Sequence, residues 1–93
     1  MDIKKLKKAR TEIDKIDQKL FLLIVKRTRI VKHMLGLKKY KKQIVDKKRI
    51  NEILKKIKIK SIQNKIDPKI PTRIWKSMIW SYVEYQRKNF KKT

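Results

Sequence analysis

A long apolar stripe runs along the first third of this 93-residue chain. Its residues recur with heptad spacing in two rows. The first row holds Leu6, Ile13, Leu20 and Met34, and the second holds Ala9, Ile16, Leu23, Ile30 and Leu37. Recurrence every seven residues indicates an α-helix that packs lengthwise against another helix. A helix from about residue 3 to residue 37 would be roughly 50 Å long.

Few residues interrupt helical structure in the rest of the chain. Gly36 is the only glycine, and Pro68 and Pro71 are the only prolines. With so few breakers, turns should be few and helices long. Apolar residues at helical spacing predict a second helix over about 47–59 and a third over about 67–90.

The segments between these helices are polar or lose the helical period. The segment 39–47 predicts a loop, and Asp46 near its end is a good N-cap for the second helix. The segment 61–67 is polar and predicts an irregular connection. No segment shows the strict alternation of a strand. The expected fold is all-α, with one long and two shorter helices in a single domain of residues 1–93.

The length of the first helix has a consequence for assembly. Two shorter helices of the same chain cannot cover a stripe of roughly 50 Å along its whole length. A second copy of the same helix is the simplest partner for it. A homodimer is therefore expected from burial alone.

Composition excludes several kinds of site. The chain has no cysteine and a single histidine, His33, so we expect neither a disulfide nor a protein-built metal site. Its longest strongly apolar run, residues 20–25, is far too short to span a bilayer. The first residues lack the apolar segment of a secretory signal. A cytoplasmic protein that does not enter membranes is expected by default.

The net charge of +22 suggests nucleic-acid binding as one alternative function. However, 24 of the 30 basic residues are lysine and only 6 are arginine. Lysine and isoleucine are favoured by AT-rich coding sequence, so much of this charge is explained by mutational bias on solvated faces. Arginine binds phosphate and carboxylate groups better. Specific nucleic-acid binding is therefore not expected.

One charged residue interrupts the apolar stripe. Arg27 occupies a core position of the first heptad row, where burial without an anionic partner costs several kcal/mol. Lys38 lies about 20° from Arg27 on the helical wheel and so on the same face. Arg49 adjoins the apolar row of the second helix, and Gln86 continues that of the third. Together they predict a small, dry, cationic pocket for a compact anion with two carboxylates.

Each of these residues also has a plainer explanation by itself. Arg27 can extend its charge to solvent, and Lys38 is one of 24 lysines. Arg49 can pair with a neighbouring carboxylate, and Gln86 can satisfy a hydrogen bond in the core. Nothing in the chain indicates nucleophilic or hydrolytic catalysis, because no Ser-His-Asp order and no glycine-rich phosphate loop is present.

The run ARTEIDKIDQKL at residues 9–20 resembles the opening of the all-helical chorismate mutase family, which has an arginine followed by E-I-D-x-I-D-x-x-L. The similarity continues through Arg27 and Lys38, then through the segment 45–49, and ends in the segment 82–86. It covers roughly residues 6–90 in the order and spacing of the family.

This resemblance implies a fold and an activity. The fold is an intertwined homodimer of three-helix chains with two active sites, each built from both subunits. The activity is the [3,3] Claisen rearrangement of chorismate to prephenate in aromatic amino-acid biosynthesis, which needs no cofactor. Spacing supports shared sites, because Arg10 and Arg27 lie about 25 Å apart along one helix. Only an Arg10 from the other chain could bind the same small diacid as Arg27.

The resemblance also implies roles for individual residues. Arg10 of one protomer, with Arg27 and Lys38 of the other, would hold the two carboxylates. Lys38 and Gln86 would hydrogen-bond to the ether oxygen, so that Arg27, Lys38 and Gln86 form the catalytic set. Asp46 would contact the ring hydroxyl through its backbone. The implied substrate-binding set is Arg10, Arg27, Lys38, Asp46, Arg49, Tyr82 and Gln86.

Two positions depart from the family pattern. Ile50 stands where the family usually has a glutamate that binds the ring hydroxyl, and Tyr82 stands where mutases often have a small hydroxyl residue. Both changes resemble the related isochorismate-pyruvate lyases, whereas Asp46 matches the mutases. The leading hypothesis is a chorismate mutase. The alternatives are a lyase on the same fold and, more remotely, a basic helical dimer that binds nucleic acid.

Overall fold

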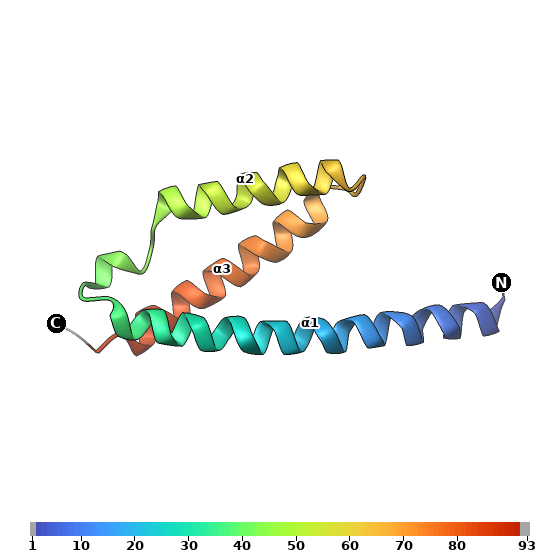
Figure 1. The fold of residues 1–93 in the computed structure, drawn as a ribbon, viewed down its shortest axis with the longest axis horizontal. Helices are drawn as coiled ribbons and strands as arrows, with labels where there is room; N and C mark the ends of the chain where they lie inside the picture. Colours follow the sequence, from blue (N-terminus) through green and yellow to red (C-terminus); the bar gives the residue numbers. More distant parts are fainter. Residues whose placement is uncertain (1, 92–93) are drawn as a thin grey trace. The chain divides into compact units, whose positions relative to one another are not determined.

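The computed structural model describes residues 2–91, and helices make up most of them. The long helix α1 spans Ile3–Leu37 and is followed by a short 3-10 helix, η1, at Lys41–Gln43. The shorter helices are α2, Lys47–Gln63, and α3, Lys69–Asn89 (Figure 1). Among the described residues there is no strand. The prediction of an all-α fold with one long and two shorter helices is confirmed.

The chain divides into two units, Met1–His33 and Met34–Thr93, and each is considered by itself. The first unit is most of α1, a single helix. Since one helix has nothing to pack against, it cannot bury its own apolar stripe. No described residue of α1 is buried, and Leu20, Leu23 and Ile30 are 50%, 60% and 60% exposed.

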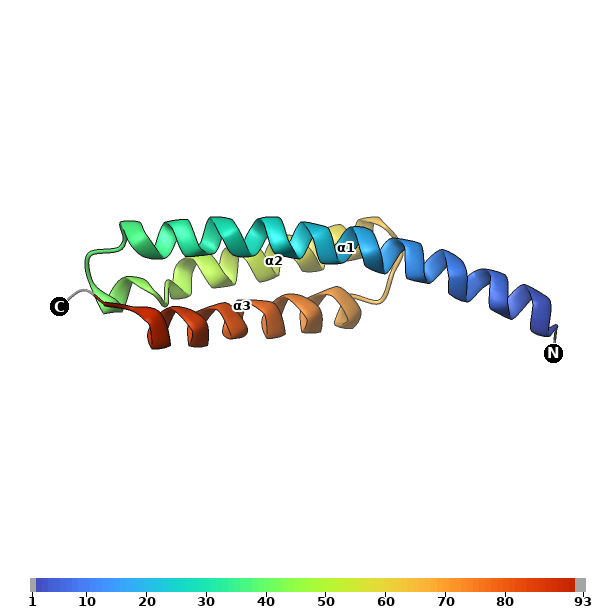
Figure 2. The same ribbon diagram turned by 90° about the horizontal axis from the view of Figure 1, so that it is seen from below.

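The second unit contains a small core. Helices α2 and α3 pack against each other and are joined by the turn at 64–68 (Figures 1 and 2). On α3, Ile79 and Val83 are buried, and Ile44 from the loop before α2 is buried as well. Ile74, earlier on α3, is 56% exposed. Its backbone lies in the first turns of α3, short of the region where the buried side chains gather.

Helix α2 is longer than its composition indicated. The polar segment 61–67 predicted an irregular connection, whereas the helix continues through Gln63. The Ser61 hydroxyl donates a hydrogen bond to the Ile57 carbonyl at 2.7 Å, and Ser61 is buried. A serine whose hydroxyl bonds back to the preceding turn is compatible with helix, because its polar group is satisfied locally.

The end of α2 is a Schellman motif without glycine. The Lys65 amide donates to the Ile62 carbonyl and the Ile66 amide donates to the Ser61 carbonyl, both at 3.1 Å. This pattern requires a left-handed residue, and Lys65 adopts it with φ of 57°. A lysine pays a steric penalty here that glycine avoids.

Helix α3 begins close to the predicted position. Pro68 is the N-cap residue, and the Asp67 carboxylate accepts a hydrogen bond from the Lys69 amide at 3.0 Å. Pro71 lies in the first turn, where the missing N–H has no partner in the helix anyway.

Candidate active site

Two residues of the predicted catalytic set meet in the second unit. Lys38 comes directly after α1, and Gln86 lies in the last turns of α3. The Lys38 ammonium (Nζ) donates a hydrogen bond to the Gln86 side-chain carbonyl (Oε1) at 2.5 Å. Gln86 is buried, and its amide nitrogen donates to the Tyr82 carbonyl at 3.2 Å. These two hydrogen bonds therefore hold both side chains in place near the C-terminal end of α3.

This pair keeps donors for a ligand. An ammonium has three N–H donors and a glutamine amide has two. The pair uses one donor of Lys38 for Gln86 and one of Gln86 for the helix backbone. Lys38 and Gln86 therefore each keep at least one N–H donor that these two hydrogen bonds do not use.

The electrostatics of Lys38 reflect its surroundings. Burial lowers the pKa of the Lys38 ammonium below its usual value, and the Asp46 carboxylate opposes this shift. A partly desolvated cation interacts more strongly with negative charge than a fully solvated one. Lys38 is therefore suited to stabilising an oxygen that gains negative charge.

The start of α2 places two more of the predicted residues. The Asp46 carboxylate accepts a hydrogen bond from the Arg49 amide at 3.0 Å and so caps the helix, as predicted. The cap leaves the Arg49 guanidinium uninvolved in this bond, and the Arg49 side chain is exposed. Ile50, the next residue, is partly buried and presents no acceptor.

Arg10 and Arg27 lie in the first unit, both on α1. Arg10 is exposed, and Arg27 is intermediate in exposure. Because α1 is continuous between them, the two residues of one chain are about 25 Å apart along its axis. The structure thus does not bring Arg10 and Arg27 of the same chain together.

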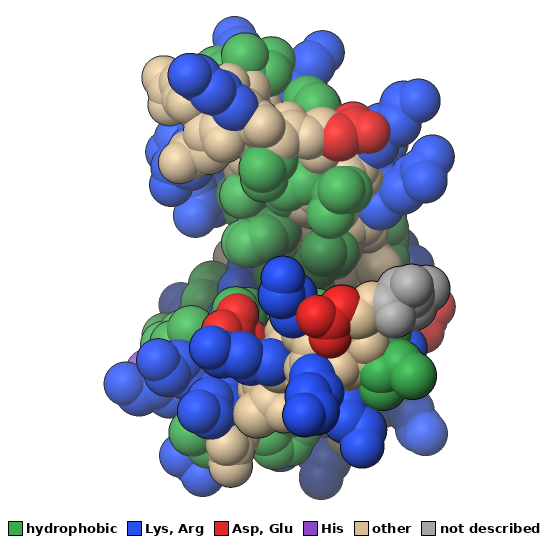
Figure 3. Space-filling view, turned by 90° about the vertical axis from the view of Figure 1, so that its right-hand side faces the viewer, with side chains coloured by type: hydrophobic (Ala, Val, Ile, Leu, Met, Phe, Trp, Pro, Cys, Tyr) green, Lys and Arg blue, Asp and Glu red, His purple; other side chains and the backbone are tan. Residues whose placement is uncertain are grey.

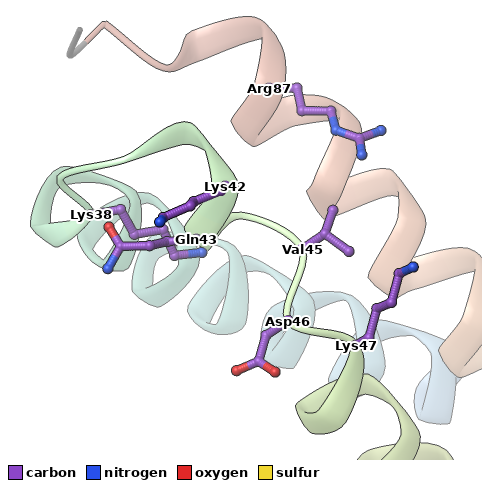
Figure 4. A pocket seen from close by; sticks show the side chains of 7 residues that line it. All are labelled: Lys38, Lys42, Gln43, Val45, Asp46, Lys47 and Arg87. Carbon is purple, nitrogen blue, oxygen red and sulfur yellow. The ribbon is translucent and has the colours of Figure 1, made fainter.

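A concave site of about 690 Å³ adjoins Lys38 in the second unit (Figure 4). Its lining includes Lys38 and Asp46 from the predicted set. Sequence reasoning missed its other members, which are Lys42, Gln43, Val45, Lys47 and Arg87. Two of them are lysines among 24, and nothing in the sequence distinguishes them. Arg87 did carry a signal, because arginine is scarce and this one directly follows Gln86.

The loop at this site is held by its own side chains. The Gln43 side-chain carbonyl accepts hydrogen bonds from the Lys39 and Tyr40 amides at 2.8 and 2.9 Å. The Lys42 ammonium lies 5.6 Å from the centroid of the Tyr40 ring, within the range of a cation–π contact. These contacts give the 39–43 segment a defined shape beside Lys38.

Comparison with known families decides the identity of the domain. The model of the family described as "Chorismate mutase type II" matches residues 9–87, which is most of the chain. The chain belongs to the chorismate mutase type II family. Its activity is that of a chorismate mutase, an isomerase that converts chorismate to prephenate, and chorismate is its substrate. Neither the curated proteins nor the solved structures that were searched gave a match.

Two observations concern membranes and nucleic acids as partners of this chorismate mutase. Within residues 2–91, no helix combines the length and the apolar character that crossing a membrane requires. On the face shown in Figure 3, lysine and arginine side chains are scattered and do not gather in one patch.

Proposed function

We propose that this chorismate mutase acts as a homodimer with two equivalent active sites. Each site combines Arg10 of the partner subunit with residues of one protomer. In this proposal Arg10 and Arg27 bind carboxylates, and Lys38 and Gln86 bind the ether oxygen. Asp46, Arg49 and Tyr82 complete the substrate-binding set.

The observation that carries this proposal is the hydrogen bond between Lys38 and Gln86. The two residues are 48 positions apart in the sequence, and the family resemblance assigns both of them to the ether oxygen. A lysine and an amide that serve one oxygen must lie side by side.

The exposure of α1 supports the dimer. Most large apolar side chains of the two heptad rows remain about half exposed or more, among them Ile13, Ile16 and Leu20 at 55%, 57% and 50%. Such a row of exposed apolar residues is costly in water, at about 25 cal/mol for each Å². A second copy of α1 would cover it with matching heptads.

The separation of Arg10 and Arg27 supports sites that are shared between chains. Chorismate is a small diacid, far shorter than the roughly 25 Å that separates these residues on one helix. In a two-fold symmetric dimer with antiparallel α1 helices, Arg10 of the partner subunit approaches the half of α1 that carries Arg27. Each site then receives cations for both carboxylates.

These residues suit the chemistry of the reaction. The rearrangement breaks the ether C–O bond and forms a C–C bond in one pericyclic step, so it requires no nucleophile and no base. Binding both carboxylates holds the enolpyruvyl arm over the ring. As the C–O bond lengthens, negative charge develops on the ether oxygen, and the Lys38 ammonium and Gln86 amide stabilise it.

The proposal is tested by turnover of the two candidate substrates. Wild-type protein is incubated separately with chorismate and with isochorismate, and prephenate and pyruvate are measured. We expect prephenate from chorismate and no pyruvate from isochorismate. Release of pyruvate would support the lyase alternative, and unaltered prephenate formation by Lys38→Ala would contradict the site.

That the enzyme is cytoplasmic stays a prediction.

A further inference from the structure

Three cations beside the active site have no role in the rearrangement. They are Lys42 on η1, Lys47 at the start of α2 and Arg87 in the last turn of α3. These residues come from three elements, yet they line the same concave site as Lys38 (Figure 4). The site therefore opens from solvent onto Lys38, the hydrogen-bond partner of Gln86, through a cationic lining.

The charge of this lining is not neutralised locally. Among residues 2–91, none of Lys42, Lys47 and Arg87 forms an ion pair, and Asp46 is the one carboxylate in the lining. The Asp46 carboxylate already accepts the Arg49 amide at the start of α2. Four cations against one carboxylate leave a positive site about 690 Å³ in volume.

All three cations are exposed, so they do not form part of the core. Arg87 adjoins Gln86 but is rotated about 100° from it around α3, and so points away from the buried amide. Lys42 is positioned by the Tyr40 ring. These residues are therefore placed to meet a ligand on its way to Lys38, whereas the ether oxygen would be bound deeper.

We propose that Lys42, Lys47 and Arg87 form a cationic entrance that attracts and binds the dianionic substrate beside Lys38. This inference rests on the proposed function, because it needs the active site to contain Lys38 and Gln86. A concave site lined by one sign of charge concentrates ligands of the opposite sign. Because the entrance residues bind the substrate through its overall negative charge and do not contact the ether oxygen, they should interact equally with substrate and transition state, and so lower KM without changing kcat.

The experiment compares two triple variants that lose the same charge. The entrance variant carries Lys42→Gln, Lys47→Gln and Arg87→Gln. The control variant carries Lys55→Gln, Lys58→Gln and Arg73→Gln, which also removes two lysines and one arginine from exposed helical positions. Prephenate formation is measured from about 0.02 M to about 0.5 M NaCl, over which the Debye length falls from roughly 20 Å to roughly 4 Å. Circular dichroism checks that both variants keep their helices.

We expect KM of the entrance variant to rise about tenfold at the lowest salt, with kcat within about twofold of wild type. The difference should shrink to about twofold at the highest salt, because screening removes the contribution of the entrance. The control variant should change KM by less than about threefold at every salt concentration.

Equal KM changes in the two triple variants would overturn the proposal, because net charge alone would then explain the effect. A parallel loss of kcat in the entrance variant would also overturn it, because these residues would then act on the transition state or the fold. If instead the proposed active site is wrong, the result is different, because Lys38→Ala would then keep the kcat of the wild type. If the entrance triple disturbs the helices, the single variant Arg87→Gln gives the same test with a smaller shift in KM.

Discussion

Lys38 and Gln86 are joined by a hydrogen bond from the lysine ammonium to the glutamine side-chain carbonyl, across 48 residues of sequence. Gln86 is in turn tied to the Tyr82 carbonyl of its own helix. The bond links the residue that follows α1 to the last turns of α3. It thus joins the two ends of the second unit at the point where the proposed chemistry takes place.

Replacing either member of this pair should slow the reaction strongly. We expect Lys38→Met and Gln86→Met each to lower kcat by about 10²–10³-fold, because each removes a donor to the oxygen that gains charge. The double variant should lose less than the product of the two effects, since both residues serve one atom. The measurement is the initial rate of prephenate formation. Lys88→Met and Gln63→Met, both exposed, are the matched controls and should keep wild-type kcat.

The activity should fall on the alkaline side at a pH lower than an ordinary lysine would give. The charged form of Lys38 exists below its pKa, and burial lowers that pKa. As pH rises through the lowered pKa, the ammonium is lost and kcat falls with one proton. Lys38→Arg should remove this alkaline fall, because arginine stays charged.

Asp46 offers a check on the origin of this pH dependence. The Asp46 carboxylate raises the pKa of Lys38 against the effect of burial. Asp46→Asn removes the charge and keeps a good N-cap for α2. We therefore expect the alkaline fall to move to lower pH in this variant, with little loss of helix stability. A profile that does not move would mean that another group controls the alkaline side.

Two inactive variants should restore activity when mixed. Arg10→Ala and Arg27→Ala are each expected to be nearly inactive as homodimers. If each site takes Arg10 from one subunit and Arg27 from the other, the mixed dimer has one intact site. After unfolding and refolding an equal mixture, about a quarter of wild-type activity should return. Absence of recovery in a verified mixed dimer would show that both arginines come from the same chain.

Lys65 is a position at which glycine should stabilise the fold. Lys65 is left-handed with φ of 57° and ends α2. Lys65→Gly removes the steric cost of the side chain and should raise the free energy of unfolding by about 0.5–1 kcal/mol. Thermal denaturation followed by circular dichroism measures the change. Lys60→Gly, within α2, is the control and should destabilise by about 1 kcal/mol.

Local sequence signals were sufficient for most of the helical elements. The heptad rows predicted α1 at the bounds that it has, and Asp46 correctly predicted the start of α2. The predicted end of α2, at about residue 59, was wrong, because the polar composition of the segment that starts at Ser61 indicated a loop. The Ser61 hydroxyl donates to the Ile57 carbonyl of the preceding turn, and that carbonyl is in reach only once the helix has formed.

The candidate site was predictable only as a set of residue types. Lys38, Arg49 and Gln86 were identified from their positions on the expected helices, and the family resemblance added Asp46 and the roles of all four. Lys38 and Gln86 do lie together. Lys42 and Lys47 could not be distinguished from the many other lysines, because their common feature is a shared position in space. No periodicity of the sequence relates Lys42 on η1 to Lys47 at the start of α2 or to Arg87 at the end of α3.

The sequence by itself determined the helices and the family, because heptad spacing, helix caps and the motif at residues 9–20 act over short distances along the chain. Only the tertiary structure decided which cations surround Lys38 and that its ammonium meets Gln86. The physical reason is that the packing of α2 against α3 sets where the ends of these helices lie relative to the loop that carries Lys38. Contacts between residues so distant in sequence depend on that packing.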